Sequence, residues 1–375
     1  MLLQDRYDEK DYGDAMQPKE YVPWLYQQMA RAVVKAWESR TVGAVAWGLG
    51  QAVVGHNRRV VYSDGTAKMH GSTNDPQFRH IEGYEDHALH VLCFYDSQKR
   101  LKAAAITLAC TAQCASGNKV SADFWHDVRR LLHERYGEAV CVLGFCAPAG
   151  DQTPRLQVGR KSDQRMYELR GLNYTQEIGR RIAGAFDDVA GVIAKDIRTD
   201  VPLVHRVRQV ELPARIVTDA EHAVAKKVCE EIDAKKKREK ADAWTRHLYG
   251  LVVQRYLAQH KGGCKTYAVE MHVLRLGDVA IATNPFELYV DYGVQIQARS
   301  PAVQTFLIQL ASTGRQHGYY VPTPRAVAAG TLDDRPFTNY SATVATNMVG
   351  PEGAQVLVDR TVDEINQLWK APAKQ

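Results

Sequence analysis

The segment RLGDVAIATNPFELYVDYGVQIQARSPAVQTFLIQLA, residues 275–311, is the most informative part of this chain for its fold. Residues 279–283 form a short β-rich apolar run, which Asn284 and Pro285 interrupt. Glu287 follows at once, and residues 288–296 have the pattern of the first turns of a helix. A carboxylate at the tip of a strand, just before a helix, is where open α/β sheets bind ligands. Asn284 and Glu287 are therefore candidate site residues, unless Glu287 only complements the dipole of the helix.

Strand-like runs and helical patterns alternate along the rest of the chain. Apolar periodicity predicts helices at 21–39, 122–136, 175–193, 218–240, 243–259 and 355–369. It predicts strands at 42–54, 87–95, 101–110, 139–146, 203–212, 267–276, 279–283 and 305–310. Two neighbouring pairs of these strands are joined by short turns, so the pattern favours a layered α/β domain with a mixed sheet flanked by helices. No repeat or linker divides the chain, and we expect one domain over residues 1–375, with residues 1–20 as a poorly ordered or peripheral lead-in.

Composition limits the classes of function. The 375 residues are 45% hydrophobic, which is enough for a large core, and the formal net charge is +5 from 48 basic and 43 acidic residues. This small excess does not indicate nucleic-acid binding, and no apolar run approaches the roughly 20 residues that span a bilayer. The acidic start lacks the apolar segment of a signal peptide. Seven cysteines without a CxxC motif indicate a reducing compartment, so we expect a cytoplasmic protein without a disulfide framework.

Polar clusters follow several of the predicted strands and could carry chemistry. Asn57 and Arg58 lie in the run His-Asn-Arg-Arg, and arginine is the usual partner of planar anionic groups. Two adjacent arginines diverge on an extended backbone, so only one can enter a pocket, and a surface salt bridge is the alternative. Asp151 follows another strand and would orient a catalytic group or cap the next segment. Gln113 and the thiol of Cys114 occupy a third loop.

Five segments together resemble the neutral/alkaline, non-lysosomal ceramidase-like family. They read WGLGQAVVGHNRRVVYSDG, VSADFWHDVRRLLHERYG, VLGFCAPAGDQTPRL, LRLGDVAIATNPFELY and MVGPEGAQVLV. The resemblance runs from about residue 21 to the end, and this chain is most similar to the shorter bacterial relatives that lack the C-terminal β-sandwich. It implies an α/β fold around a zinc site and, in true ceramidases, amide hydrolysis by a serine nucleophile.

The resemblance can be carried over at a few positions. The Asn-Arg pair that contacts substrate in the family matches Asn57 and Arg58. The zinc-binding glutamate matches Glu287, although the loop here reads Asn-Pro-Phe-Glu, and the zinc-contacting tyrosine matches Tyr340. The Gly-Asp of the nucleophile loop matches the pair that ends at Asp151.

The departures from the family pattern concern its catalytic groups. Ala147 stands where the family has its serine, and Thr111 or Gln113 stands where a zinc-binding histidine is normal. No His-x-His segment precedes the helix predicted at 21–39. A zinc site made from Glu287 and Tyr340 alone would hold metal only if histidines came from elsewhere, and the substitutions argue against ceramidase activity itself.

Three hypotheses follow. The first is a hydrolase acting on a polar small molecule, an amide or a glycoside, with Asp151 and Glu287 as an acid/base pair. Substrate would be bound by Asn57, Arg58, Gln113, Asn284 and Tyr340. The second is a catalytically silent, ligand-binding protein of the same fold. The third is a thiol-dependent enzyme that uses Cys114.

Overall fold

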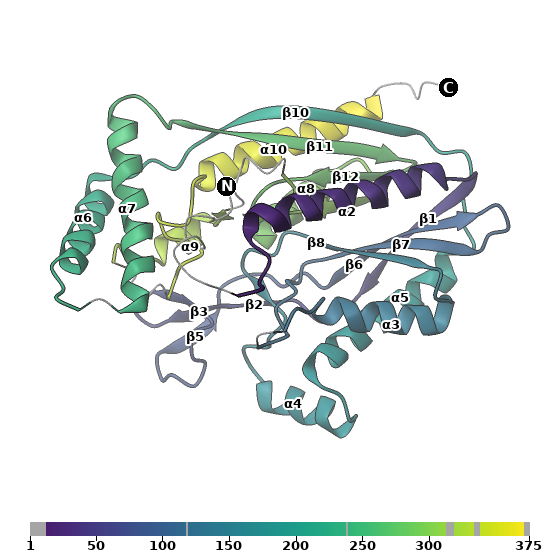
Figure 1. The fold of residues 1–375 in the computed structure, drawn as a ribbon, viewed down its shortest axis with the longest axis horizontal. Coiled ribbons are helices and arrows are strands. Elements are labelled where there is room, and N and C mark those ends of the chain that lie inside the picture. The colour runs from purple at the N-terminus through teal and green to yellow at the C-terminus, as the bar shows by residue number, and fades with distance from the viewer. Residues whose placement is uncertain (1–12, 118, 238, 313–318, 334–337, 371–375) are drawn as a thin grey trace.

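Two four-stranded sheets form the centre of the protein (Figure 1). The computed structural model describes residues 13–117, 119–237, 239–312, 319–333 and 338–370. The first sheet has the order β1-β6-β7-β8, with strands β1 (Gly43–Gln51), β6 (Ala88–Asp96), β7 (Leu101–Leu108) and β8 (Cys141–Cys146). The second has the order β10-β11-β12-β14, with strands β10 (Leu203–Pro213), β11 (Thr266–Leu276), β12 (Val279–Thr283) and β14 (Gln304–Ile308).

Both sheets are mixed. In the first, β7 and β8 are parallel and the other neighbours are antiparallel. In the second, β12 and β14 are parallel and the other neighbours are antiparallel. Both predicted hairpins, β6–β7 and β11–β12, are confirmed. Because each parallel pair ends on the same side of its sheet, the loops that follow β8, β12 and β14 can be brought together.

Helices cover the outer face of each sheet. The first sheet packs on α3 (Phe124–Tyr136) and α5 (Tyr174–Ile193) around a core that includes Val91, Ile106 and Phe186. The second packs on α8 (Val290–Arg299) and α10 (Pro351–Lys370). Leu92, Val279 and Phe306 make a further apolar contact between the two sheets. The order of layers is therefore helix, sheet, sheet, helix, which confirms the predicted layered α/β class with mixed sheets.

The remaining elements are short or peripheral. A small sheet of order β4-β3-β5 consists of three short strands, β3 (Arg59–Tyr62), β4 (Ala67–Met69) and β5 (Phe78–Ile81). Two two-stranded ladders are formed by β2 (His56–Asn57) with β9 (Gln152–Thr153), and by β13 (Glu287–Leu288) with β15 (Tyr320–Val321). The other helices are α4 (Arg160–Leu169), α6 (Asp219–Asp233), α7 (Lys240–His260) and α9 (Pro324–Ala328).

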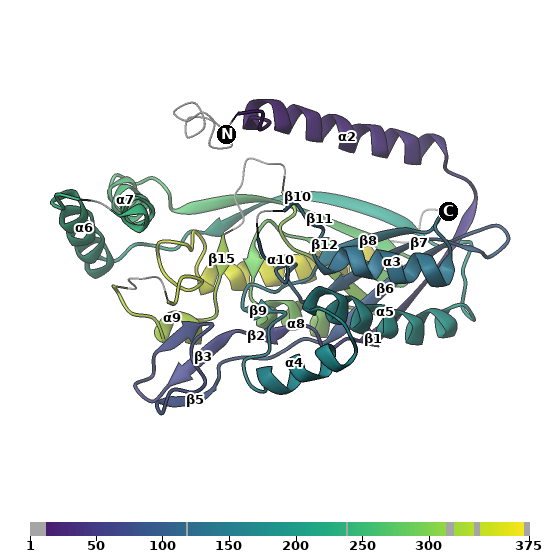
Figure 2. The same ribbon diagram turned by 60° about the horizontal axis from the view of Figure 1, so that its bottom comes forward.

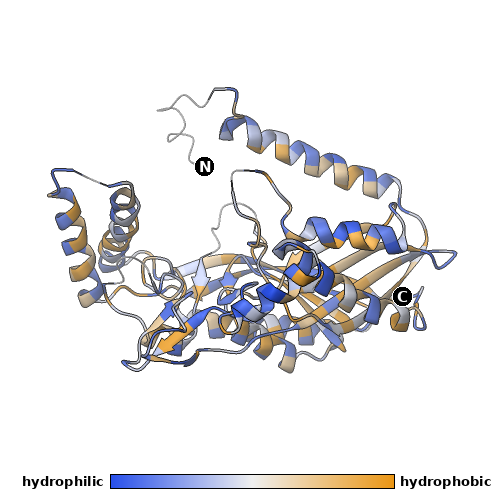
Figure 3. Ribbon diagram, turned by 90° about the horizontal axis from the view of Figure 1, so that it is seen from below, coloured by the Kyte–Doolittle hydropathy of each residue, from blue (hydrophilic) through white to orange (hydrophobic). Residues whose placement is uncertain are grey.

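The first described helix, α2 (Pro18–Glu38), lies apart from the body of the molecule (Figures 2 and 3). It confirms the helix predicted near residues 21–39, but none of its residues is buried. Its apolar side chains, such as Met29 and Trp37, are more than half exposed. Among the described residues, no helix is long and apolar enough to cross a membrane. All seven cysteines are free in the structure.

Candidate active site

The loops that follow β8, β12 and β14 meet at one place, and Gln309 joins them. The backbone N–H of Gln309 donates to the carbonyl oxygen of Cys146, at the end of β8, over 3.0 Å. The Gln309 side-chain oxygen accepts from the backbone N–H of Ala149 at 3.2 Å and from that of Leu288 at 3.1 Å. One buried amide therefore fixes the loop after β8 against the strand β13 that carries Glu287.

Gly150 makes this contact close. Its N–H donates to the carbonyl oxygen of Leu288 at 2.9 Å. A Cβ atom at position 150 would lie 2.3 Å from the carbonyl oxygen of Glu287, far inside van der Waals contact. Only glycine permits this approach of the two backbones.

Glu287 lies in β13, three residues before α8 begins at Val290. The interpretation that Glu287 complements the dipole from the first turn of the helix is therefore wrong, and Asp291 has that position. Glu287 pairs across the β13–β15 ladder with Tyr320, whose hydroxyl donates to the Glu287 carboxylate. Burial raises the pKa of Glu287, and the Tyr320 hydrogen bond and the charge of Arg58 lower it in part. Glu287 as a whole residue is half-buried.

The Arg58 guanidinium lies between this pair and the loop at Gly150. Its Nη2 donates to the Gly150 carbonyl oxygen at 2.9 Å and to the Tyr320 hydroxyl at 3.4 Å. The guanidinium carbon lies 5.9 Å from the ring centre of Tyr320 and 5.9 Å from that of Tyr340. The two tyrosine rings meet edge to face with their centres 5.6 Å apart. The structure thus brings Arg58, Glu287 and Tyr340 together, with Tyr320 among them.

Arg59 diverges from Arg58, as an extended backbone requires. It is fully buried and pairs with Glu82 through Nε at 2.6 Å and Nη2 at 2.8 Å. Its Nη1 donates to the Asn339 side chain and to the Ser341 hydroxyl. Arg59 therefore holds the loop that presents Tyr340, while Arg58 belongs to the candidate site. The alternative considered for the two arginines was a surface salt bridge. The ion pair between Arg59 and Glu82 is instead buried.

Asp151 and Asn57 are buried behind this site. Asp151 is 1% exposed and Asn57 is fully buried. The Asp151 carboxylate accepts from the Asn57 side-chain amide at 2.8 Å and from the backbone N–H of Val290, the first residue of α8, at 3.0 Å. Burial raises the pKa of Asp151 to about 6, and the hydrogen bond from the Val290 N–H opposes the shift. In this geometry Asp151 caps α8 and orients Asn57, one of the roles considered from the sequence.

Two other candidates have local hydrogen-bond partners. Asn284 is buried, and its side-chain oxygen accepts from the backbone N–H of Phe286 at 3.0 Å, which closes the turn after β12. Gln113 is exposed, and its amide donates to the Thr111 hydroxyl. Among the described residues, no recorded hydrogen bond connects Gln113 with Arg58, Asp151 or Glu287.

The groups around Glu287 do not fit a zinc site. Zinc in proteins takes three or four nitrogen, sulfur or carboxylate ligands. Here the described groups that interact with Glu287 are the Tyr320 phenol, the Arg58 guanidinium and, electrostatically, the Cys146 thiol, and no cluster of three or more His, Cys, Asp or Glu in the described part of the chain could hold a metal ion. At the position of the family's serine, Ala147 is buried in a small apolar cluster with Ala109, Ala149 and Val290.

The thiol of Cys114 is not activated. It is 8% exposed, and burial together with the charge of Asp123 raises its pKa far above the usual value. A nucleophilic cysteine requires the thiolate, whose formation needs a lowered pKa. The geometry therefore does not support the thiol-dependent hypothesis.

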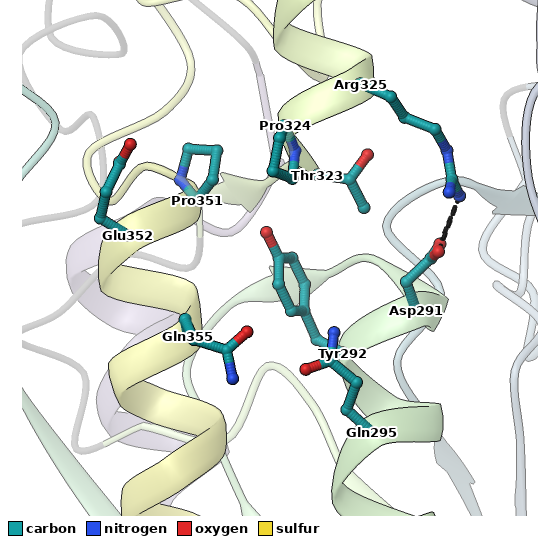
Figure 4. Close-up of a pocket in the computed structure, with 9 residues that line it drawn as sticks. All are labelled: Asp291, Tyr292, Gln295, Thr323, Pro324, Arg325, Pro351, Glu352 and Gln355. Atoms are coloured by element: carbon teal, nitrogen blue, oxygen red, sulfur yellow. Dashed lines mark hydrogen bonds and ion pairs between the residues drawn. The ribbon is translucent and has the colours of Figure 1, made fainter.

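A hollow of about 530 Å³ lies between α8, α9 and the start of α10 (Figure 4). Its lining includes Tyr292, Glu352 and Gln355, and Arg325 forms an ion pair with Asp291 at 2.7 Å. Arg58, Glu287 and Tyr340 do not line this hollow. Arg325 and Asp291 neutralise each other, so this ion pair offers no unpaired charge to a ligand in the hollow.

The two sheets with helices on both outer faces define a layered α/β protein, and comparison with solved structures specifies the fold. The structure is similar to the crystal structure of neutral ceramidase from Pseudomonas aeruginosa, with a TM-score of 0.61 and 16% sequence identity over 96% of this chain and 57% of that one. A ceramidase complexed with C2 gives a TM-score of 0.56 and 17% identity over 89% of this chain and 55% of that one. The chain thus has the neutral-ceramidase fold and spans little more than half the length of these structures. No family model and no curated protein matches the sequence.

Two residues that organise the site were not assigned from the sequence. Tyr320 lies in a polar run, but only its pairing with Glu287 in β15 indicates a role. Gln309 follows β14 directly, and nothing in its sequence context indicates that its amide joins two other loops. Both roles arise from contacts between segments far apart in the chain.

Proposed function

We propose that this protein is a hydrolase that cleaves an amide bond in a polar small molecule, with Glu287 as the general base. The observation that supports this most strongly is the chain of groups from Arg58 through Tyr320 to Glu287. A half-buried carboxylate with a raised pKa is suited to accept a proton near neutral pH. The neutral-ceramidase fold is consistent with such a reaction.

The reaction would use one activated water molecule. Glu287 takes a proton from the water, and the water oxygen attacks the carbonyl carbon of the amide. The positive charge of Arg58 stabilises the oxyanion that forms. Glu287 then gives the proton to the amide nitrogen, the C–N bond breaks, and a carboxylic acid and an amine leave. Each group returns to its starting state.

The arrangement of carboxyl groups in the site suits an amide substrate better than a glycoside. Glycoside hydrolysis usually needs two carboxyl groups that face the scissile bond. Asp151 was the predicted partner of Glu287, but both of its carboxylate oxygens already accept hydrogen bonds, one from Asn57 and one from Val290. We therefore assign Asp151 and Asn57 as positioning residues, and Arg58 and Tyr340 as the residues that contact substrate.

Arg58 has capacity for a further hydrogen bond. It is 3% exposed, and its Nε has no hydrogen-bond partner among the described residues. A buried N–H group without a partner costs free energy, which a bound carbonyl or carboxylate oxygen would recover. This supports Arg58 as the group that binds the substrate's oxygen.

The test is a panel of chromogenic N-acyl 4-nitroanilides and 4-nitrophenyl glycosides. We expect the wild-type protein to hydrolyse anilides, and Glu287→Gln to lower kcat by roughly 10²-fold or more, the usual loss for a general base. Glu352→Gln, in the hollow of Figure 4, removes one carboxylate outside the site and should leave kcat unchanged. Hydrolysis of glycosides alone, or equal activity of Glu287→Gln and wild type, would contradict the proposal. Absence of any turnover would favour the ligand-binding hypothesis.

A further inference from the structure

The loop that leaves the candidate site at Asp151 leads to a second cavity beside α4. This cavity has a volume of about 310 Å³ and is lined by Arg155, Arg160, Asp163, Tyr167 and Tyr174, among others. Its volume is at the lower end of the range for small-molecule sites. Neither Glu287 nor Arg58 lines it, so it is distinct from the site described above.

Within the part of the chain that the structure describes, the two arginines of the cavity have no carboxylate partner. Arg155 is exposed, and its side chain makes no recorded hydrogen bond or ion pair within the described residues. Among the described residues Arg160 donates only to neutral oxygens, from Nε to the Leu156 carbonyl at 2.6 Å and from Nη2 to the Gln157 side chain at 2.8 Å. The carboxylate of the cavity, Asp163, forms an ion pair with Arg181. Two guanidinium charges therefore remain for a ligand.

The start of α4 adds to the positive field of the cavity, and the neighbouring His70 is affected by the charges there. Thr73 donates to the Gln157 carbonyl oxygen at 3.0 Å, which places the loop of His70 beside the cavity. Burial, followed by the charges of Arg58, Arg155 and Arg160, lowers the pKa of His70 to about 4, so its imidazole is neutral at pH 7. The helix α4 begins at Arg160, where the helix dipole is also positive, and its N-cap Gly159 supplies no capping side chain.

Aromatic side chains form another part of the lining. The rings of Tyr167 and Tyr174 have their centres 5.7 Å apart at an angle of 46°. Tyrosine rings offer an apolar face to a flat ligand group, with a contribution beyond the area buried. The cavity thus combines an oxyanion-binding side with an aromatic side.

We propose that this cavity binds a small molecule in which a phosphate or sulfate group is attached to a flat, apolar ring. Arg155 and Arg160 contact the oxyanion, because guanidinium groups match the oxygen geometry of such anions. Tyr167 contacts the ring. This assignment does not depend on the hydrolysis proposed above, since it concerns other residues and is tested by binding alone.

The test is calorimetric titration of the full chain with inorganic phosphate, 4-nitrophenyl phosphate, 4-nitrophenyl sulfate and 4-nitrophenol. We expect one or both esters to bind and 4-nitrophenol to fail. Arg155→Gln should weaken binding of the ester about tenfold, the loss expected for one charge-assisted hydrogen-bond donor. Arg165→Gln makes the same change on α4 outside the cavity and should have less than a twofold effect. Tyr167→Leu should weaken the aromatic ester and leave inorganic phosphate unchanged.

Three results would overturn the proposal. The first is the absence of heat with every anion at millimolar concentration. The second is binding of 4-nitrophenol as tight as that of its esters. The third is an equal loss in Arg155→Gln and Arg165→Gln, which would indicate a general effect of net charge.

Discussion

The side-chain amide of Asn57 donates a hydrogen bond of 2.8 Å to the carboxylate of Asp151, and both residues are buried. This contact connects the ladder β2–β9 with the first N–H of α8, because the second oxygen of Asp151 accepts from Val290. The backbone N–H of Arg58 donates to the Asp151 carbonyl oxygen at 2.9 Å. Asp151 therefore fixes the position of Arg58 relative to the segment that carries Glu287.

The first prediction concerns the pH dependence of stability at Asp151. The pKa of its carboxyl group is about 6 in the folded protein and about 4 in an unfolded chain, so the folded protein binds this proton more tightly. The contribution of Asp151 to stability should therefore fall as the pH rises from about 4 to about 6. The free-energy difference between wild type and Asp151→Asn should shift by up to about 3 kcal/mol over this range in favour of the variant. Urea unfolding of both proteins at pH 4 and pH 7 measures it, and a difference that grows in the opposite direction would refute the assignment.

The second prediction concerns Gly150. A methyl group there would lie 2.3 Å from the Glu287 carbonyl oxygen, so Gly150→Ala must displace β13. We expect a loss of about 1–3 kcal/mol in the free energy of unfolding, as for other overpacked sites. Gly191→Ala is the control, because that glycine lies in α5 with no atom within 4 Å of an added Cβ. It should be neutral or stabilising by up to about 1 kcal/mol. Equal free energies of unfolding for the two variants would contradict the close approach of Gly150 to the Glu287 carbonyl oxygen.

The third prediction concerns Gln309. Gln309→Leu leaves the N–H groups of Ala149 and Leu288 without their acceptor in a buried site. Each unsatisfied donor costs roughly 1–3 kcal/mol, so the free energy of unfolding should fall by about 2–6 kcal/mol. Gln98→Leu makes the same change in an exposed turn and should have little effect. If chemical denaturation gave the same midpoint for both variants, Gln309 would not have the joining role described.

The sequence predicted the layers of the fold because each layer depends on local apolar periodicity. In β10, for example, more buried and exposed residues alternate along the strand, and its buried apolar side chains pack in the same cluster as those of α10. The helix α4 and the short ladders were not predicted, since two-residue strands such as β13 form through pairing with distant segments. For the same reason the sequence placed Glu287 between a strand and a helix and did not predict the short strand β13 to which it belongs. The sequence proposed Arg58, Glu287 and Tyr340, which lie close together in the structure, but it gave no indication that Tyr320 lies among them.

The central claim is that Glu287 acts as a base whose pKa depends on its hydrogen bond from Tyr320. The most direct measurement is the pH dependence of kcat/KM on a hydrolysed 4-nitroanilide for wild type and Tyr320→Phe. We predict a rise in rate above the usual pKa of a glutamate, because burial raises the pKa of Glu287. The rise should move to higher pH in Tyr320→Phe, since that variant loses a hydrogen bond that favours the carboxylate. An acid limb at the same pH in both proteins, or one that persists in Glu287→Gln, would contradict the claim.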